Sequence, residues 1–298
     1  MDLIPDRLGP TPPARPRGRL RRALMIALVA LAGIAALASA YWMSLSQEDR
    51  DARRIAYERS ERRMLASAGM PLPGAPDLAN LDGRLNAQGM RLGAPILMRI
   101  FKREFELELW MARDGRYEKF ATYPICTWSG RLGPKHKTGD HQAPEGFYDV
   151  GKDALNPNSK YHRSFNLGFP NAYDQTHGRT GSFLMVHGAC ASVGCYAMTD
   201  AQITEIWTLV TAALDAGQPA FQVQAYPFRM TADNLAAYRG HPHAAFWADL
   251  GKGHDLFEQT GLPPSASVCG GRYTFTAGRS VTGASGLAIR CNEAAAKN

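Results

Sequence analysis

The sequence predicts a mainly β (α+β) body, preceded by an N-terminal apolar helix and followed by a helical appendage. Three observations support this prediction. Short apolar runs with strand character recur between residues 96 and 228, one strongly capped helix begins near residue 199, and an uncharged segment follows a basic N-terminus. With 298 residues, of which 45% are hydrophobic, the chain can bury a sizeable core.

The N-terminal segment predicts export. Residues 1–22 hold six arginines and two aspartates, and the next 25 residues, 23–47, carry no charge. Such a segment is long enough to cross a bilayer, and the charge asymmetry places its N-terminus in the cytoplasm. The alternative, a buried core helix, would have to be apolar on all sides at the very start of the chain. Because Ala38-Ser39-Ala40 suits signal cleavage, we expect either an inner-membrane anchor or a removed signal peptide. The rest of the chain is then periplasmic or in the cell envelope.

The charge distribution argues against nucleic-acid binding. The formal net charge is +7, but the first 22 residues account for more than half of it. Downstream there is no basic stripe with interleaved aromatic residues, which nucleic-acid binding would require. We therefore predict no nucleic-acid partner.

Between the apolar segment and the body, composition predicts a stalk and a linker. Residues 48–64 alternate charges and helix formers, as in a solvated helical stalk, and residues 65–78 are rich in Ala, Pro and Gly. A short packing helix is expected within residues 81–91. The catalytic body is predicted to span residues 93–228, and the appendage residues 229–298.

Strands of the body are predicted from apolar runs and period-two alternation. Arg113-Asp114-Gly115 is a hairpin turn between two of them. The long Gly/Asn/Pro/Tyr-rich loop before residue 182 is expected to be functional, because loops of that length are seldom idle. The predicted strands cover residues 96–101, 104–112, 117–125, 146–150, 182–188 and 221–228.

Two helical regions are predicted in the second half of the chain. Thr199-Asp200-Ala201-Gln202 is a capping-box sequence that starts an amphipathic helix, which Gly217 ends. Residues 231–260 are also expected to be helical, with an interruption at residues 240–242.

Five cysteines in an exported chain leave at least one thiol unpaired. Cys269 and Cys291 bracket a short Gly-rich tail and are the predicted disulfide, since such a tail gains most from a crosslink. Of Cys126, Cys190 and Cys195 at most two can pair. Either Cys190–Cys195 or Cys126–Cys190 is possible on these grounds.

The segment 183–200, FLMVHGACASVGCYAMTD, has the parts of a thiol active site. His187 at a strand end supplies a base, Gly194 allows a sharp turn that exposes Cys195, and Ser192 can bond to the turn or fix the imidazole. Backbone amides around the turn could hold an oxyanion, and the helix start near Thr199 favours a thiolate. His187 alone could equally be a structural histidine.

A zinc site is the other chemistry that this segment permits. His187, Cys190 and Cys195 would be joined by Cys126, but a structural zinc site usually presents two close ligand pairs, and the second pair is missing. We therefore predict no metal and no other cofactor.

HGACASVGCYAMTD resembles the active-site segment of the L,D-transpeptidase catalytic domain (YkuD-type) family, in its YafK-like branch. Three further blocks agree: GAPILMRIFKREFELELWM, SGRLGPKHKTGDHQAPEGFYDV and YHRSFNLGFPNAYDQTHGRTG. The four blocks cover about residues 93–228. The resemblance implies a β-sandwich or barrel core, Cys195 as nucleophile and His187 as base. It implies attack on a peptide carbonyl next to meso-diaminopimelate, giving a thioester.

The resemblance leaves the acceptor open. An amine would give transpeptidation of peptidoglycan stem peptides, and water would give hydrolysis. Val193 replaces the second histidine of the broad family pattern, and no arginine closely follows Cys195. These departures match the YafK-like branch, some of whose members resemble an amidase that releases a peptidoglycan-linked outer-membrane lipoprotein. A third reading is a catalytically idle wall-binding module in which Val193 marks decay of the site.

The implied substrate carries an ammonium and a carboxylate, so complementary charges are expected in the long loop. Each candidate could equally be a solvated surface charge. The candidates are Lys135, Arg163 and Arg179 for the carboxylate and Asp174 for the ammonium, with Tyr148, Tyr161 and Tyr173 as wall residues.

Overall fold

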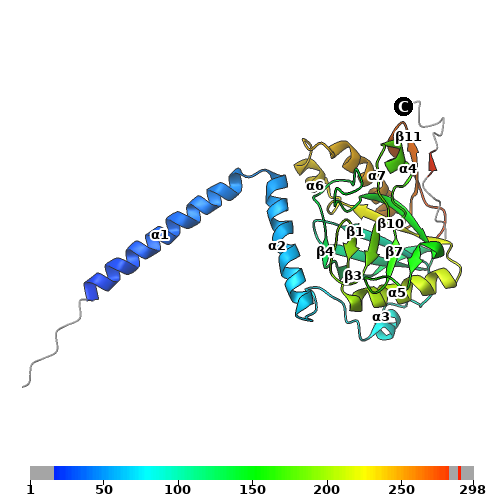
Figure 1. The fold of residues 1–298 in the computed structure, drawn as a ribbon, viewed down its shortest axis with the longest axis horizontal. Coiled ribbons are helices and arrows are strands. Elements are labelled where there is room, and N and C mark those ends of the chain that lie inside the picture. The colour runs from blue at the N-terminus through cyan, green and yellow to red at the C-terminus, as the bar shows by residue number, and fades with distance from the viewer. Residues whose placement is uncertain (1–16, 282–287, 290–298) are drawn as a thin grey trace, which may run out of the picture. The chain divides into compact units, whose positions relative to one another are not determined.

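The computed structural model describes residues 17–281 and 288–289 (Figure 1). The chain divides after Arg50 into two compact units. The first unit contains the whole of helix α1, in which Arg21–Ser44 is long and apolar enough to cross a membrane, by length and composition. The predicted N-terminal apolar helix, α1 (Arg17–Ser44), is therefore present.

One five-stranded sheet forms the first half of the body. Its order is β3-β2-β1-β10-β5, with β1, β2 and β3 as an antiparallel meander and β10 parallel to β1. Positive φ angles at Asp114 and Gly115 form the predicted hairpin turn. The strands are β1 (Ile96–Phe101), β2 (Glu106–Arg113), β3 (Arg116–Pro124), β5 (Gly146–Gly151) and β10 (Ala220–Tyr226).

A second five-stranded sheet is built from very short strands, in the order β4-β9-β8-β7-β6. Its strands β8 and β9 are parallel, which is unusual for neighbours joined by so short a loop. The predicted strand 182–188 is confirmed only in its last part. The strands are β4 (Thr127–Trp128), β6 (Leu155–Asn156), β7 (Ser164–Asn166), β8 (Met185–His187) and β9 (Tyr196–Ala197), and the 3₁₀ turn η1 (Lys152–Ala154) precedes β6.

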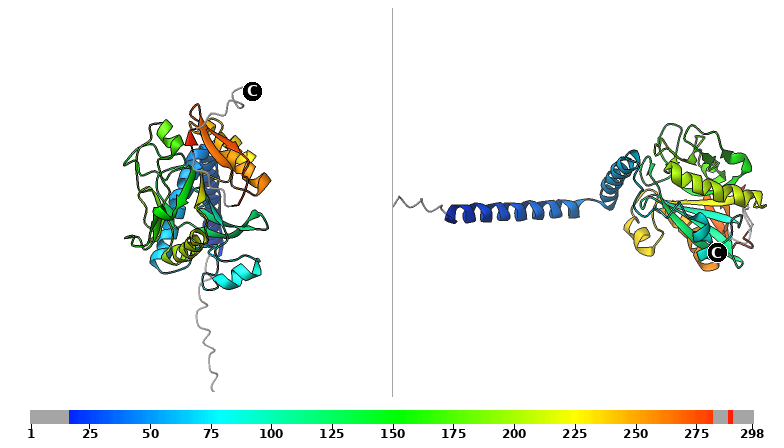
Figure 2. Two further views of the ribbon diagram at one scale, coloured as in Figure 1. Left: turned by 90° about the vertical axis from the view of Figure 1, so that its right-hand side faces the viewer. Right: turned by 90° about the horizontal axis from the view of Figure 1, so that it is seen from below.

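Both sheets and helix α5 (Asp200–Asp215) share one apolar core (Figures 1 and 2, α5 in yellow-green). The predicted capping box is confirmed: the Thr199 hydroxyl accepts the Gln202 N–H, and the Gln202 side chain accepts the Thr199 N–H. The core includes Ile96, Val186, Tyr196, Ile206 and Val223, none of which is exposed to solvent.

The α+β prediction is confirmed, but "mainly β" describes only the core. Helices α1 and α2 alone contribute 28 and 21 residues, and the chain as a whole is a mixed α and β protein. The apolar pattern of the sequence predicted the strands of the core. The helices at either end of the chain were predicted as segments outside the β body.

From Asp51 onward, helix α2 (Gln47–Ser67) is docked on the body, which corrects the prediction of a solvated stalk. Ile55 is 3% exposed and belongs to the core. The Arg59 guanidinium lies 4.3 Å from the centroid of the Trp128 ring and donates to the Gly130 carbonyl at 2.7 Å. Arginine can pack its flat face on aromatic rings while staying charged, so a charged helix need not be solvated.

The C-terminal part also packs on the body. A second, aromatic-rich cluster joins residues of β5 and β10 to Trp247, Tyr273 and their neighbours. The predicted helical interruption is confirmed, since the structure has two helices here. The elements are α6 (Ala232–Ala237), α7 (Ala244–Thr260), β11 (Ser265–Cys269), β12 (Arg272–Thr276) and β13 (Ala288–Ile289); the remaining short helices are α3 (Leu81–Ala87) and α4 (Ala172–Thr176).

The cysteines resolve the open pairing. Cys126 and Cys190 form a disulfide, and Cys195 is a free thiol. The alternative Cys190–Cys195 pairing is therefore wrong. The zinc site is also wrong, because Cys126 and Cys190, two of its four candidate ligands, are bonded to each other. Cys269 is disulfide-bonded, and its predicted partner Cys291 lies outside the described residues.

Candidate active site

Strands β8 and β9 bring the predicted nucleophile and base onto one face. Val186 lies opposite Tyr196, and His187 lies opposite Ala197. Cys195 immediately precedes Tyr196, so in the same register it lies next to Met185. Side chains alternate along a strand, and Val186 and Tyr196 are fully buried in the core. Cys195 and His187 therefore project from the opposite face of the sheet.

The turn between the two strands depends on two glycines. Gly194 has a φ of +108°, a region that other residues rarely adopt. At Gly188, an added Cβ would lie 2.5 Å from the Asp200 carboxylate and 3.0 Å from the Tyr161 carbonyl. Gly188 therefore lets the turn pack tightly on the start of α5, directly after His187. The Cys126–Cys190 disulfide ties the same turn to the chain just before β4.

Two serine hydroxyls hold the turn at the nucleophile. Ser192 Oγ accepts the Cys195 N–H at 3.1 Å and donates to the Cys195 carbonyl at 2.7 Å. Ser129 Oγ accepts the Gly194 N–H at 2.5 Å and donates to the His141 carbonyl at 2.7 Å. The Gly194 and Cys195 amides, which the sequence led us to expect free for an oxyanion, are thus hydrogen-bonded in the resting structure.

The tautomer of His187 follows from its one polar contact. Its Nδ1 lies 2.6 Å from the Gly188 carbonyl oxygen, which can only accept, so Nδ1 carries the proton. In the neutral ring Nε2 then keeps a free lone pair, as a general base requires. Burial lowers the pKa of His187 below its ordinary value, and the Gly188 carbonyl only partly offsets this. The ring is therefore neutral at neutral pH.

The Cys195 thiol is protonated in the resting state. Burial raises the pKa of this thiol, and the Met185 N–H and the Lys135 charge only partly offset the effect. Its sulfur accepts the Met185 N–H at 3.4 Å and donates to the Phe183 carbonyl at 3.6 Å. We expected the start of α5 to favour a thiolate, but burial has the larger effect. The pair is a neutral thiol and a neutral imidazole.

Both side chains line one cavity of about 320 Å³. The Tyr161 ring lies 4.7 Å from the His187 ring, centroid to centroid, and covers one side of the imidazole. Arg63 from α2 lines the same cavity. The remaining lining residues are Cys190, Ala191, Ser192 and Val193. The cavity therefore combines a thiol, an imidazole and one guanidinium.

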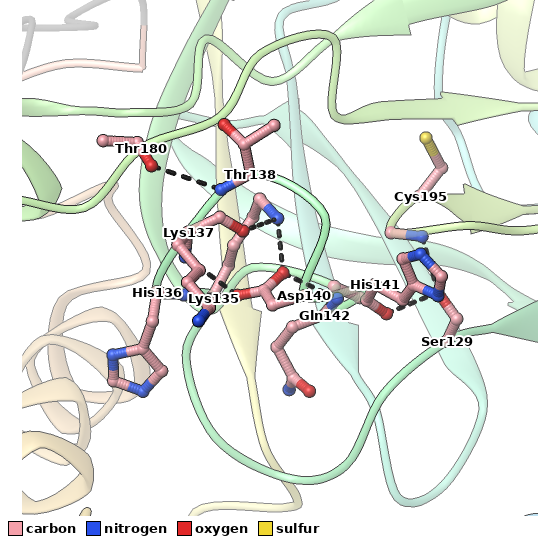
Figure 3. Close-up of polar contacts among 12 residues, drawn as sticks. Ser129, Lys135, His136, Lys137, Thr138, Asp140, His141, Gln142, Thr180 and Cys195 are labelled. Atoms are coloured by element: carbon pink, nitrogen blue, oxygen red, sulfur yellow. Dashed lines mark hydrogen bonds and ion pairs between the residues drawn. The ribbon is translucent and has the colours of Figure 1, made fainter.

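Below the turn, residues 135–142 form a loop organised around one carboxylate (Figure 3). Asp140 accepts hydrogen bonds from the Lys135 ammonium at 2.5 Å and from the His136, Lys137 and Gln142 amides at 2.8 to 3.0 Å. Burial acts to raise the pKa of Asp140, but these hydrogen bonds outweigh it and lower the pKa to about 2. The loop thereby fixes the His141 carbonyl that holds Ser129.

A buried ion pair anchors the same region. Lys102 and Glu145 are 2.9 Å apart and both side chains are 0% exposed. The ammonium also donates to the carbonyls of Arg131, Gly133 and Ala143 at 2.9 to 3.0 Å. Trp247 Nε1 donates to Glu145 at 2.8 Å, which links the C-terminal helix α7 to the loop. The appendage therefore helps to position the loop below the catalytic turn.

Most of the predicted substrate-binding residues have internal partners. Asp174 and Arg179 form a buried ion pair of 2.7 Å, and Lys135 pairs with Asp140. Tyr148 donates to Asp174, Tyr173 stacks on Tyr273, and the Arg163 guanidinium lies 5.8 Å from the Trp207 ring. None of these six is among the described residues that line the Cys195 cavity, whereas Tyr161 is.

The sequence did not single out Ser129, Arg63 or Asp140. Ser129 stood in a block quoted for its resemblance, but nothing in the block marks one hydroxyl above others. Arg63 was part of a charge run that suggested a solvated face. The Asp140 cluster could have been suspected from Lys-x-x-x-x-Asp in a loop, although that spacing alone is common.

Comparison with known proteins agrees with this geometry. Residues 103–224 match the family model YkuD, the L,D-transpeptidase catalytic domain. The chain is also 48% identical over 182 residues to YafK of Escherichia coli (strain K12), provisionally named an L,D-transpeptidase, and equally to YafK of Escherichia coli O157:H7. Each alignment covers 61% of this chain and 74% of YafK. The chain belongs to the L,D-transpeptidase catalytic domain family, and within it to the YafK-like branch.

Solved structures show a more distant likeness. The helical cell shape determining protein Pgp2 from Campylobacter jejuni is 20% identical with a TM-score of 0.37, over 62% of this chain and 66% of that one. Bd1075 from Bdellovibrio bacteriovorus is 13% identical with a TM-score of 0.33, over 56% of this chain and 72% of that one.

Proposed function

We propose that this protein is a cysteine acyltransferase acting on peptidoglycan stem peptides in the cell envelope, with Cys195 as nucleophile and His187 as general base. The observation that carries the proposal is the placement of a free thiol and a neutral imidazole on one face of β8 and β9, lining one cavity. Membership of the L,D-transpeptidase family supports peptidoglycan as the substrate.

The first step is acylation. Cys195 gives its proton to Nε2 of His187 as its sulfur attacks the carbonyl carbon of a peptide bond next to meso-diaminopimelate. His187 then returns the proton to the leaving amine, the C–N bond breaks and a thioester forms. Because burial favours the neutral form of both groups at rest, His187 has to take the thiol proton before or during the attack.

The negative charge formed on the substrate oxygen needs donors. The Gly194 and Cys195 amides lie beside the sulfur, but each is engaged by a serine hydroxyl at rest. They can hold the oxyanion only if Ser129 and Ser192 turn away or share the amide. Ser192 would then keep its bond to the Cys195 carbonyl and preserve the turn.

The second step chooses between transfer and hydrolysis. An amine acceptor resolves the thioester by transpeptidation, and water resolves it to a free acid. Hydrolysis would include release of a peptidoglycan-linked outer-membrane lipoprotein. In both cases His187 takes a proton from the acceptor and the Cys195 sulfur leaves.

The proposal is tested with the full chain in detergent and a diaminopimelate-containing muropeptide. Intact-mass measurement should find an adduct on the wild type and on Cys190→Ala, and none on Cys195→Ala. Product masses then separate a new cross-link from a released fragment. An adduct on Cys195→Ala, or a wild type that never acylates, would rule out the assignment; the second outcome would favour an idle wall-binding module.

A further inference from the structure

The Cys195 cavity does not stand alone. A second cavity of about 670 Å³ adjoins it, and Arg63 and Cys190 line both. The other walls of the second cavity come from the end of α2 and the segment after it, residues 66–78, and from the start of α5 at residues 199–202. Substrate that enters at Cys195 can therefore extend past Arg63 into this space.

The wall formed by residues 66–78 is an ordered structure, although its composition suggested a linker. Leu72 is 2% exposed, the Met70 N–H donates to the Leu65 carbonyl at 2.9 Å, and the Ala75 N–H donates to the Leu72 carbonyl at 3.0 Å. The lining side chains are small or apolar and include Ala66, Met70, Pro71, Ala75 and Leu78. Such a wall suits a ligand with small apolar side chains.

Arg63 is the cation at the junction. Its neighbours on α2 contact the body: Arg59 donates to the Gly130 carbonyl at 2.7 Å, and Arg62 donates to the Ile125 carbonyl at 3.4 Å. No hydrogen bond or ion pair joins the Arg63 guanidinium to another side chain or carbonyl in the described ranges, and Arg63 is exposed. A guanidinium that borders two cavities without an anion of its own is suited to a ligand carboxylate, which it can bind with two parallel hydrogen bonds.

We propose that Arg63 and the second cavity form an extended subsite, in which Arg63 binds a carboxylate of the substrate and the wall of residues 66–78 holds its peptide chain. The inference rests on the proposed function and names its substrate more closely: an acidic, alanine-containing peptide, as peptidoglycan stems are. Helix α2 lies outside the matched catalytic domain, so this specificity comes from the segment before it.

The binding test does not depend on turnover. In a Cys195→Ala background, the full chain in detergent is titrated with a stem tetrapeptide carrying free carboxylates, and with the same peptide fully amidated. Arg63→Ala should weaken binding of the acidic peptide by roughly 10- to 100-fold, the range for a hydrogen bond to a charged group, and leave the amidated peptide unchanged. Arg54→Ala, an exposed arginine on the same helix that does not line the cavities, is the matched control.

A second variant tests the cavity itself. Ala201→Trp, on the exposed start of α5, should fill the space and weaken binding of both peptides. Equal affinity of Arg63→Ala and its parent for the acidic peptide, or unchanged binding by Ala201→Trp, would overturn the inference. The proposed function would survive that result, because acylation of Cys195 is measured separately; conversely, a wild type that binds the peptide through Arg63 but never acylates would refute only the function.

Discussion

The Ser129 hydroxyl and the Gly194 N–H are 2.5 Å apart, and this one contact joins the catalytic turn to the loop that follows β4. The Ser129 hydroxyl in turn donates a hydrogen bond to the His141 carbonyl in that loop. Asp140 and the Lys102–Glu145 pair hold that loop in turn. The position of the Cys195 thiol therefore depends on groups far from it in sequence.

We expect Ser129→Ala to lower kcat for Cys195 acylation by about 10-fold with little change in KM, because a misplaced nucleophile affects the transition state more than ground-state binding. Pre-steady-state acylation followed by intact mass measures this. Ser129→Thr keeps the hydroxyl and should restore most of the rate. If Ser129→Ala were faster than the wild type, the hydroxyl would be a competitor for the oxyanion amide and not a support.

Local sequence patterns were sufficient to predict the strands and helices whose own residues show a regular apolar pattern or a capping sequence. The strand at residues 96–101 and the capping box at Thr199 were identified because alternation and capping are local. Cys195 and His187 could be proposed as the site residues, since a glycine turn between a histidine and a cysteine is a chemical pattern within eight residues, and their roles stay a prediction. Their placement on one face then followed from the register of β8 and β9.

Tertiary contacts decided the features that the sequence could not reveal. Strands β6 and β9 have two residues each and show no periodicity, so they are defined only by their partners. Residues 48–64 were predicted to form a solvated helix because they are dense in charge, yet the Arg59 guanidinium packs on Trp128. The direction of the Cys195 pKa shift depended on burial, which no spacing of residues reports.

A pH profile tests the role of the Tyr161 ring over His187. In the proposed mechanism His187 acts in its neutral form, and burial keeps its pKa below the ordinary value of 6.5, so activity should persist below pH 6.5 in the wild type. Tyr161→Ala exposes the imidazole to water and lets its pKa rise towards 6.5. The acidic limb of kcat/KM should then move to higher pH, with the largest loss of activity near pH 6.

Tyr161→Phe is the control for this prediction, because it keeps the ring that covers His187 at 4.7 Å and removes only the hydroxyl. Its acidic limb should match that of the wild type. A limb that does not move in Tyr161→Ala would mean that other groups desolvate the imidazole. A limb that is absent from every variant would argue against His187 as the base.

The Cys126–Cys190 disulfide should stabilise the fold without being needed for chemistry. Its sequence separation is 64 residues. A closed loop of that length corresponds to about 4 kcal/mol in the chain-entropy model. The variant with both Cys126→Ala and Cys190→Ala should therefore lose about this much free energy of unfolding, measured in urea. Thioester formation at Cys195 should be retained but slowed, since Ala189 and Cys190 adopt positive φ angles that the crosslink helps to hold.

Removing the two cysteines together avoids leaving a second reactive thiol near Cys195, and it spares the disulfide of Cys269, which a chemical reductant would also attack. Unchanged stability would show that the unfolded chain gains little freedom when the crosslink is lost. Complete loss of acylation in a folded variant would instead make the crosslink part of the catalytic machinery.

Among single substitutions, we expect Lys102→Met, which breaks the Lys102–Glu145 pair, to lower the free energy of unfolding most. Lys102→Met removes the ammonium that four oxygens share and leaves the Glu145 carboxylate buried without its counter-charge, although Trp247 and the Gly133 amide still donate to it. Breaking a buried pair in this way costs about 3–5 kcal/mol, which should appear as a lower urea midpoint. Adding Glu145→Gln removes the uncompensated charge, so the double variant should be more stable than Lys102→Met alone. A double variant that is less stable would show that Glu145 is held mainly by its neutral donors, and that the pair contributes little through charge.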